Sequence, residues 1–354
     1  MRPDPVGSTL LSRRRHPGQT RLALAAACAA AALVAAGCSS GNGGMSPVSG
    51  TITIAATPGI DDAPLYLAQE KGLFAAAGLH VRFDDVGSPT AELTAIQDGK
   101  AQIAAADYGN IFKFQQSTGS PALRILADGY DAGTGDVEIL TSPKSGLNSP
   151  TQLQSTTIGV PSDSLIPALA TTAGIPQSLI TAGASAVISN YLASPARARE
   201  LDWEPMTQTE EVAQLKSGKL KAALLTEPYI YEAETEFGAS ELLDAFSGET
   251  AGLPLSGYVS TSTWAKSNTA AVADFKSAIT QAQSEASITG PIQEALTKSA
   301  GLTAQTAAMV SIGTYPTTTS VSALTRVVLL MTDDTMLSQT TPVSIPAMLG
   351  GTSK

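Results

Sequence analysis

The sequence predicts an α/β fold of two lobes, each with a mostly parallel sheet flanked by helices. From residue 51 onward, short runs typical of strands alternate with helical runs, a pattern that favours parallel strands joined by helices. The same alternation begins again after the polar stretch Ser142–Ser155, which suits a crossover. With 354 residues, 43% of them apolar, the chain is long enough for about two domains.

In the first lobe, helix-capping residues and glycines mark the ends of the elements. Asp62 is available as the N-cap of a helix that begins near Pro64 and runs to Lys71. Ser88 caps the next helix, which Gly99 ends. The loop Asp107–Asn110 precedes a short helix, and the predicted strands are Thr51–Ala56, His80–Phe83, Ala101–Ala106, Leu123–Ala127 and Val137–Thr141.

The second lobe repeats this logic. Thr207 and Glu210 have the spacing of a capping box, and the helix that they open ends at Gly218. The other predicted elements are the strands Thr157–Val160 and Leu220–Leu225, a loop Pro161–Ser164 that leads into a helix ending near Gly174, a helix opened by Thr226–Tyr229, a returning strand Gly257–Thr261, and helical segments from Thr269 to about Ala300 and around Val321–Met331. The return is expected to place the C-terminal part on the first lobe.

The N-terminus has the pattern of an export signal. Five Arg and one Asp precede the apolar run Leu22–Val34, whose 13 residues are fewer than the roughly 20 that a membrane-spanning helix needs. Ala35–Cys38 follows and resembles a bacterial lipobox, in which the Cys is acylated. We therefore expect a lipoprotein signal peptide at 1–37, lipidation of Cys38, a flexible tether at 38–50, and anchoring to the outer face of the cytoplasmic membrane. An ordinary signal peptide cut at a nearby small residue is the alternative.

Charge and the scarce residue types narrow the class of protein. The formal net charge is −10, and removal of residues 1–37 leaves 16 basic and 30 acidic residues, a net charge of −14. This balance argues against a nucleic-acid partner. Of two Cys and two His, Cys28 and His16 fall within the export signal, so Cys38 and His80 alone cannot form a disulfide or a His/Cys metal site. We expect a protein that is not an enzyme and has no cofactor and no metal.

Three blocks of sequence resemble one known family. The run Asp62–Phe74, followed by Gly78–Val81, resembles the opening of the nitrate/sulfonate/taurine/thiamine-precursor group of ABC-transporter solute-binding proteins. The segment from Glu92 through Gly99–Ala104 is similar to the part of that group before its third strand, and Leu225–Tyr229 is similar to its Glu-Pro step. The resemblance covers roughly residues 50 to 265.

The resemblance implies a periplasmic-binding-protein-like fold of type II, with a ligand cleft between the lobes. The expected division is 51–142 for the first part of lobe 1, 143–255 for lobe 2, and 256–354 for the return to lobe 1 and the C-terminal helices, with hinges near 141–145 and 253–258. The implied partners are a small-molecule ligand and the permease and ATPase of an ABC importer. We expect a monomer whose lobes close on the ligand.

The loops that follow the strands are expected to face the cleft, because open α/β sheets bind ligands at the carboxyl ends of their strands. These loops are rich in carboxylates and hydroxyls and contain no Lys or Arg; Asp128 and Asp163 share this character. The candidate ligand-binding residues are Asp61, Asp62, Tyr66, Ser88, Asp107, Tyr108, Asn110, Tyr130, Ser162, Ser164, Glu227 and Tyr229.

Carboxylates raise the electrostatic cost of binding nitrate or a sulfonate, and tyrosine faces can stack on a flat heterocycle or a cation. This composition favours a thiamine-precursor-like pyrimidine or another neutral or cationic amine. A sulfonate-, taurine- or nitrate-binding component of the same importer class is the alternative ligand assignment. Two alternatives of another class stay open: an enzyme of the pyrimidine-synthesis type on the same scaffold, and a sensor lipoprotein without a transport partner.

Overall fold

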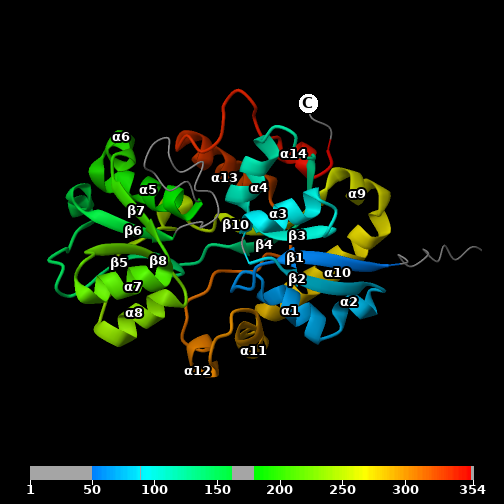
Figure 1. Ribbon diagram of the computed structural model, residues 1–354, viewed down its shortest axis with the longest axis horizontal. Coiled ribbons are helices and arrows are strands. Elements are labelled where there is room, and N and C mark those ends of the chain that lie inside the picture. Colours follow the sequence, from blue (N-terminus) through cyan, green and yellow to red (C-terminus); the bar gives the residue numbers. More distant parts are fainter. Residues whose placement is uncertain (1–49, 88, 162–178, 352–354) are drawn as a thin grey trace, which may run out of the picture. The chain divides into compact units, whose positions relative to one another are not determined.

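The computed structural model describes residues 50–87, 89–161 and 179–351. The predicted signal peptide, the lipidation site Cys38 and most of the tether lie outside these residues, as do the predicted helix near Gly174 and the candidate site residues Ser88, Ser162 and Ser164. The described part contains two five-stranded sheets (Figure 1).

The first sheet has the strand order β2-β1-β3-β10-β4. Its strands are β1 (Thr51–Ala56), β2 (His80–Asp85), β3 (Ile103–Asp107), β4 (Leu123–Asp131) and β10 (Pro254–Thr261). Helices cover both of its faces: α1 and α10, with α2, pack on one, and α3 and α4 lie on the other (Figure 1). The helices of this part are α1 (Ala63–Glu70), α2 (Leu73–Ala76), α3 (Pro89–Gln97), α4 (Tyr108–Gln116), α9 (Ser262–Ser267) and α10 (Thr269–Ala286).

The second sheet has the strand order β7-β6-β8-β5-β9. Its strands are β5 (Val137–Thr141), β6 (Thr157–Pro161), β7 (Asp202–Met206), β8 (Ala222–Thr226) and β9 (Ser240–Asp244). Helices α5 and α6 lie on one face, and α7 and α8 on the other (Figure 1). The helices of this part are α5 (Leu179–Leu192), α6 (Pro195–Arg199), α7 (Gln208–Ser217) and α8 (Tyr229–Phe237), with the short 3₁₀ helices η1 (Pro150–Ser155) and η2 (Gly248–Thr250).

The C-terminal part is helical, as predicted. It consists of α11 (Thr289–Ser299), α12 (Ala304–Ala307), α13 (Val321–Asp333) and α14 (Ile345–Met348). Within the described residues, no helix combines the length and the apolar character that a membrane span requires.

The α/β class with two mostly parallel sheets is confirmed, and each sheet also contains one strand that runs antiparallel to the other four. In the first sheet β1 is parallel to β2 and β3, whereas β10 runs antiparallel to β3 and β4. The second sheet repeats this arrangement, with β6 parallel to β7 and β8 and with β5 antiparallel to β8 and β9. In each sheet, the strand that makes the antiparallel pairs arrives by a crossover from the other sheet.

One strand lies in a different sheet from the one expected. The strand Val137–Thr141 was placed within the first part of lobe 1, but it pairs with β8 and β9 of the second sheet. The first crossover therefore falls between Asp131 and Val137, before the boundary at 142 and the expected hinge at 141–145. The strand's own sequence carries no mark of its sheet, because an apolar five-residue run fits the centre of either one.

The capping residues of α7 predicted its ends correctly, unlike the placement of the strand Val137–Thr141. Thr207 and Glu210 form the predicted capping box of α7, and Gly218 ends that helix with a φ of +79°. By contrast, the predicted loop Asp107–Asn110 is wrong: Asp107 is the N-cap of α4, and the helix begins at the next residue. The Asp107 side chain accepts a hydrogen bond from the backbone N–H of Asn110. This first-turn N–H has no acceptor within the helix.

Candidate functional site

A cavity of about 270 Å³ lies where elements of the two sheets meet. It is bordered by the loop after β1, the ends of β3 and β8, the crossover into β5, and β10. The lining residues are Gly59, Ile60, Asp61, Asp107, Tyr130, Asp136, Val137, Ile180, Thr226, Glu227, Leu255 and Ser256. Four carboxylates face this small volume, and none of the described residues that line it is Lys, Arg or His.

Asp61 and Asp107 come from the first sheet. Asp107 is held in place by Asn110, whose backbone N–H donates to Oδ1 at 2.8 Å and whose Nδ2 donates to Oδ2 at 2.5 Å. Burial raises the pKa of Asp107, while the hydrogen bonds from Asn110 and the charge of Lys113 lower it. Burial is also the largest cause of the raised pKa of Asp61, and the charge of Asp107 adds to it.

Asp136 lies in the crossover between the sheets and is only 4% exposed. Its Oδ2 accepts hydrogen bonds from the Tyr130 hydroxyl at 3.0 Å and from the Gly133 N–H at 2.8 Å, whereas its Oδ1 has no hydrogen-bond partner. Burial raises its pKa to about 6, against the lowering effect of these hydrogen bonds. A carboxylate buried to this degree is expected to meet a positive charge when it ionises.

Glu227 comes from the second sheet, directly after β8, and is 9% exposed. Its Oε2 accepts the Tyr231 N–H at 3.1 Å in the first turn of α8, and its Oε1 accepts the Ser311 N–H at 2.9 Å. Ser311 belongs to the segment that follows α12. Burial raises the pKa of Glu227, although both hydrogen bonds lower it. The side chain therefore connects the second sheet to the C-terminal part of the chain.

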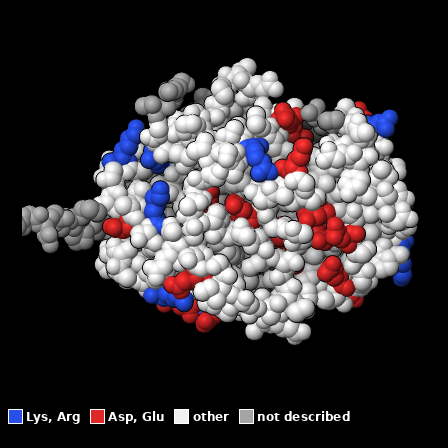
Figure 2. All heavy atoms as spheres, turned by 180° about the vertical axis from the view of Figure 1, so that it is seen from behind, with Lys and Arg blue, Asp and Glu red and all other residues white. Residues whose placement is uncertain are grey.

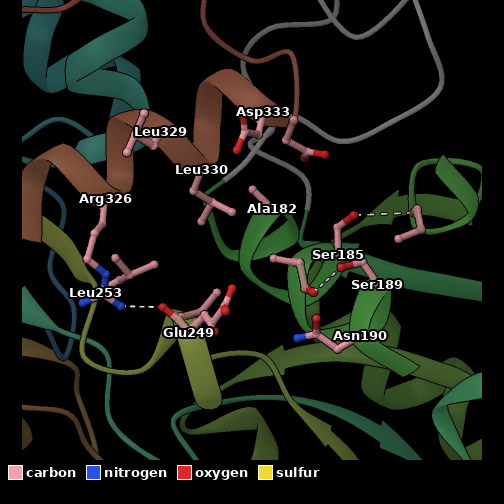
Figure 3. Close-up of a pocket in the computed structure, with 14 residues that line it drawn as sticks. Ala182, Ser185, Ser189, Asn190, Glu249, Leu253, Arg326, Leu329, Leu330 and Asp333 are labelled. Carbon is pink, nitrogen blue, oxygen red and sulfur yellow. Dashed lines mark hydrogen bonds between the residues drawn. The ribbon is translucent and has the colours of Figure 1, made fainter. Parts of the chain in front are cut away.

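A larger cavity of about 700 Å³ lies between α5 and α13 (Figure 3). Several of its polar side chains are hydrogen-bonded to the protein backbone. Arg326 donates to the backbone oxygens of Glu249 and Ala251, and Ser189 donates to the backbone oxygen of Ala186 at 2.7 Å. Its described lining residues come mainly from α5, α6, η2 and α13, and none of them ends one of the parallel strands, where α/β sheets bind ligands. The smaller cavity is the better candidate because its polar groups converge at those strand ends.

No group of three or more His, Cys, Asp or Glu within the described ranges is placed to hold a metal ion.

Comparison with known proteins gives the family. Residues 60–288 match the family model described as NMT1/THI5 like. This segment spans more than half of the chain and contains every residue that lines the cavity except Gly59. The chain belongs to the NMT1/THI5-like family. No curated protein sequence matches it.

Several solved structures share the fold of this NMT1/THI5-like protein. The periplasmic aliphatic sulphonate binding protein SsuA from Escherichia coli is 15% identical with a TM-score of 0.61, covering 80% of this chain and 91% of its own. The alkanesulfonate-binding protein SsuA from Xanthomonas axonopodis pv. citri, bound to MOPS, is 15% identical with a TM-score of 0.62, at 83% and 96% coverage. The desulfurization enzyme DSZB is 14% identical with a TM-score of 0.63, at 85% and 96% coverage.

The structure brings four of the twelve candidate residues together at the cavity: Asp61, Asp107, Tyr130 and Glu227. Asn110 lies one step behind, because it holds Asp107. Asp62 is the 4% exposed N-cap residue of α1 and does not line the cavity. Burial, followed by the charge of Asp61, raises its pKa well above the usual value.

Three of the four candidate tyrosines do not line the cavity. Tyr108 is fully buried, stacks on Phe112 and donates to the Asp128 carboxylate. Tyr66 packs against Phe83 with a centroid distance of 5.2 Å, and Tyr229 packs against the core cluster between β8 and α7. The ring of Tyr108 is therefore a core group with no face free for a ligand, while Tyr66 and Tyr229 are half-buried and lie outside the residues that line this cavity.

Asp136 and Ser256 are cavity residues that the sequence did not single out. Asp136 lies in the crossover from β4 to β5, and Ser256 lies in β10 next to Asp107 of β3, whereas the predicted site residues lie in loops that follow strands. One signal for Asp136 was available: it stands in an irregular Gly-rich stretch, Gly133–Gly135, between two strands. A carboxylate at such a crossover is close to both lobes once the crossover is correctly placed.

Proposed function

We propose that this NMT1/THI5-like protein is an extracytoplasmic solute-binding protein that captures a small molecule between two lobes and delivers it to an ABC importer. The cavity of about 270 Å³, built by elements of both sheets, is the observation that carries the proposal. The family match and the fold shared with periplasmic binding proteins support it. In this proposal residues 1–37 direct export, acylated Cys38 anchors the chain, and the protein is a monomer that does not catalyse a reaction.

For the ligand, we propose a thiamine-precursor-like pyrimidine or another neutral or cationic amine. The reason is electrostatic: a sulfonate or nitrate would enter a small cavity in which Asp61, Asp107, Asp136 and Glu227 already carry negative charge when ionised. The fold neighbours that bind sulfonates favour the opposite assignment, so a sulfonate is the competing ligand class.

An enzyme is the second candidate function, because DSZB shares the fold at a TM-score of 0.63. The described residues that line the cavity offer carboxyl and hydroxyl groups that can act as acids, bases or nucleophiles, so turnover of a bound compound decides between the two functions.

The proposed function is tested by thermal unfolding of the full-length protein in detergent with a thiamine-precursor pyrimidine, 1,4-diaminobutane, taurine, an alkanesulfonate and nitrate. A ligand at 100 times its Kd stabilises the folded state by about 2.7 kcal/mol, so the binding class should raise Tm clearly. We expect a shift with the pyrimidine or the amine and none with the anions. Glu227→Gln should abolish the shift, and Glu204→Gln, an exposed residue of β7, should leave it unchanged.

A shift only with an anion would contradict the ligand assignment and support the competing one. Mass spectrometry of the recovered small molecule separates the two functions: an unchanged ligand supports binding, and a converted one supports the enzyme. Absence of stabilisation by any small molecule would contradict the binding function itself.

A further inference from the structure

The cavity has two acidic walls that come from different parts of the chain. Asp61 and Asp107, which follow β1 and β3 of the first sheet, form one pair. Asp136 and Glu227, which precede β5 and follow β8, form the other. The cavity of about 270 Å³ is slightly smaller than typical ligand pockets of about 300–1,000 Å³, so both pairs are within reach of one small molecule.

Each wall is electrostatically coupled within itself. After burial, the charge of Asp107 contributes to the raised pKa of Asp61, and the charge of Asp136 contributes to the raised pKa of Glu227. Glu138 continues the second wall into the protein: it is 7% exposed, its Oε2 has no hydrogen-bond partner, and burial raises its pKa to about 8. Asp244 lies directly opposite it on β9. Like charges so placed repel each other.

A carboxylate oxygen of the second wall has no hydrogen-bond partner. This is evidence for a ligand that does not depend on the number of carboxylates. Oδ1 of Asp136 has no hydrogen-bond partner although the residue is 4% exposed and lines the cavity. Buried carboxylate oxygens normally have partners, and an unmade hydrogen bond to such a group costs free energy. A protonated amine would supply both the hydrogen bond and the opposite charge.

We infer that the ligand of this cavity is a short diamine or polyamine, with one ammonium group between Asp61 and Asp107 and a second between Asp136 and Glu227. This inference rests on the proposed function and narrows its ligand class. A single cation satisfies one wall and leaves the other uncompensated. Lys113 offsets part of the charge of Asp107. The negative charge of Asp136 and Glu227 therefore depends more strongly on the ligand for its compensation.

One face of the protein carries a group of acidic side chains that is compatible with a polycationic ligand. In Figure 2, adjacent acidic side chains form a group on the right of the molecule with no Lys or Arg among them, and other acidic side chains lie toward the centre of this face. Such a surface attracts cations and raises their association rate at low salt.

The inference is tested by isothermal titration of the full-length protein at pH 7.5 with 1,4-diaminobutane, 1,5-diaminopentane and spermidine. Butylamine is the matched probe with one charge, and the thiamine-precursor pyrimidine is the competing ligand. We expect one of the di- or polyamines to bind at least about 30-fold more tightly than butylamine, since each compensated wall contributes separately. Competition by salt should be stronger for the diamine than for butylamine.

Variants of the second wall remove this preference selectively. Asp136→Asn and Glu227→Gln should each weaken diamine binding at least about tenfold while changing butylamine binding less, because the first wall still holds one ammonium group. Both substitutions keep the side-chain shape, and an unchanged Tm without ligand shows that the fold is intact. Glu204→Gln on the exposed edge strand β7 should change neither affinity.

Butylamine or the pyrimidine binding as tightly as every diamine would overturn the inference and leave the proposed function standing. Equal loss of diamine and butylamine affinity in the two variants would also overturn it. Binding of none of these probes, nor of any anion, would contradict the proposed function and this inference together.

Discussion

Glu211 has no solvent exposure, and neither of its carboxylate oxygens has a hydrogen-bond partner. It lies on α7, where its side chain packs beside Gly159 of β6. Burial raises its pKa to about 9, from a usual value of 4.5. At neutral pH the folded protein therefore keeps a proton that the unfolded chain releases, and this difference makes folding depend on pH.

We predict that Glu211→Gln flattens the decrease in stability between about pH 5 and pH 8. Because the folded pKa is raised, the stability associated with this group is greatest below pH 4.5 and decreases until about pH 9. In this range the free energy of unfolding of the wild-type protein should fall by about 1.4 kcal/mol per pH unit more steeply than that of the variant. Urea unfolding at several pH values measures this slope, and Glu204→Gln serves as the exposed control. An unchanged slope in Glu211→Gln would contradict the assignment.

At the scale of elements, α7 has the most complete local signal in the chain. Thr207 Oγ1 accepts the Glu210 N–H at 3.2 Å, and Glu210 Oε2 accepts the Thr207 N–H at 2.9 Å. The helix ends at Gly218, in the left-handed conformation. α7 covers one face of the second sheet, in which β8 leads directly to Glu227. A stable α7 therefore helps to hold the sheet that positions Glu227 at the cavity.

We expect Thr207→Ala to destabilise the protein by about 1 kcal/mol, because the first turn of α7 loses its side-chain cap. Thr235→Ala is the matched control: Thr235 is an exposed threonine of α8 whose hydroxyl donates to the Tyr231 backbone oxygen. Its loss should cost less than about 0.5 kcal/mol. Urea unfolding measures the loss of stability in both variants. Equal losses in Thr207→Ala and Thr235→Ala would show that the cap makes no specific contribution.

At the scale of the whole molecule, segments from three regions of the chain meet beside the cavity. The crossover around Gly133 lies against Gly313, and Asp131 forms a β-bridge with Thr314. The Gly313 N–H donates to the Tyr130 hydroxyl, and two residues earlier the Ser311 N–H donates to Glu227. A Cβ on Gly133 would lie 2.6 Å from Gly313 Cα, so glycine is required by this close approach.

We predict that Gly313→Ala destabilises the protein by about 1–3 kcal/mol and weakens ligand binding. The added Cβ would collide with the Asp131 backbone oxygen and displace the segment that donates to Glu227. Gly290→Ala is the matched control, because a Cβ there meets nothing within 4 Å and the residue lies in α11. Thermal unfolding with and without ligand tests both effects; a wild-type Tm and affinity in Gly313→Ala would contradict this role.

The sequence by itself determined the α/β class, the family resemblance, the ends of α7, and three of the four cavity carboxylates. These features depend on short-range physics: hydrophobic period, capping hydrogen bonds, glycine conformation and the position of a residue just after a strand. Asp61, Asp107 and Glu227 could be found because each lies at or shortly after the end of a strand.

The tertiary structure alone decided which sheet Val137–Thr141 joins, and with it the position of Asp136 at the cavity. It also decided that Tyr108 is a core residue, with its hydroxyl bonded to Asp128. Strand pairing and side-chain burial depend on contacts between residues far apart in the chain. A local sequence pattern does not determine these contacts. An apolar strand fits either sheet, and a tyrosine after a strand fits either a cleft or a core, until the rest of the chain packs around it.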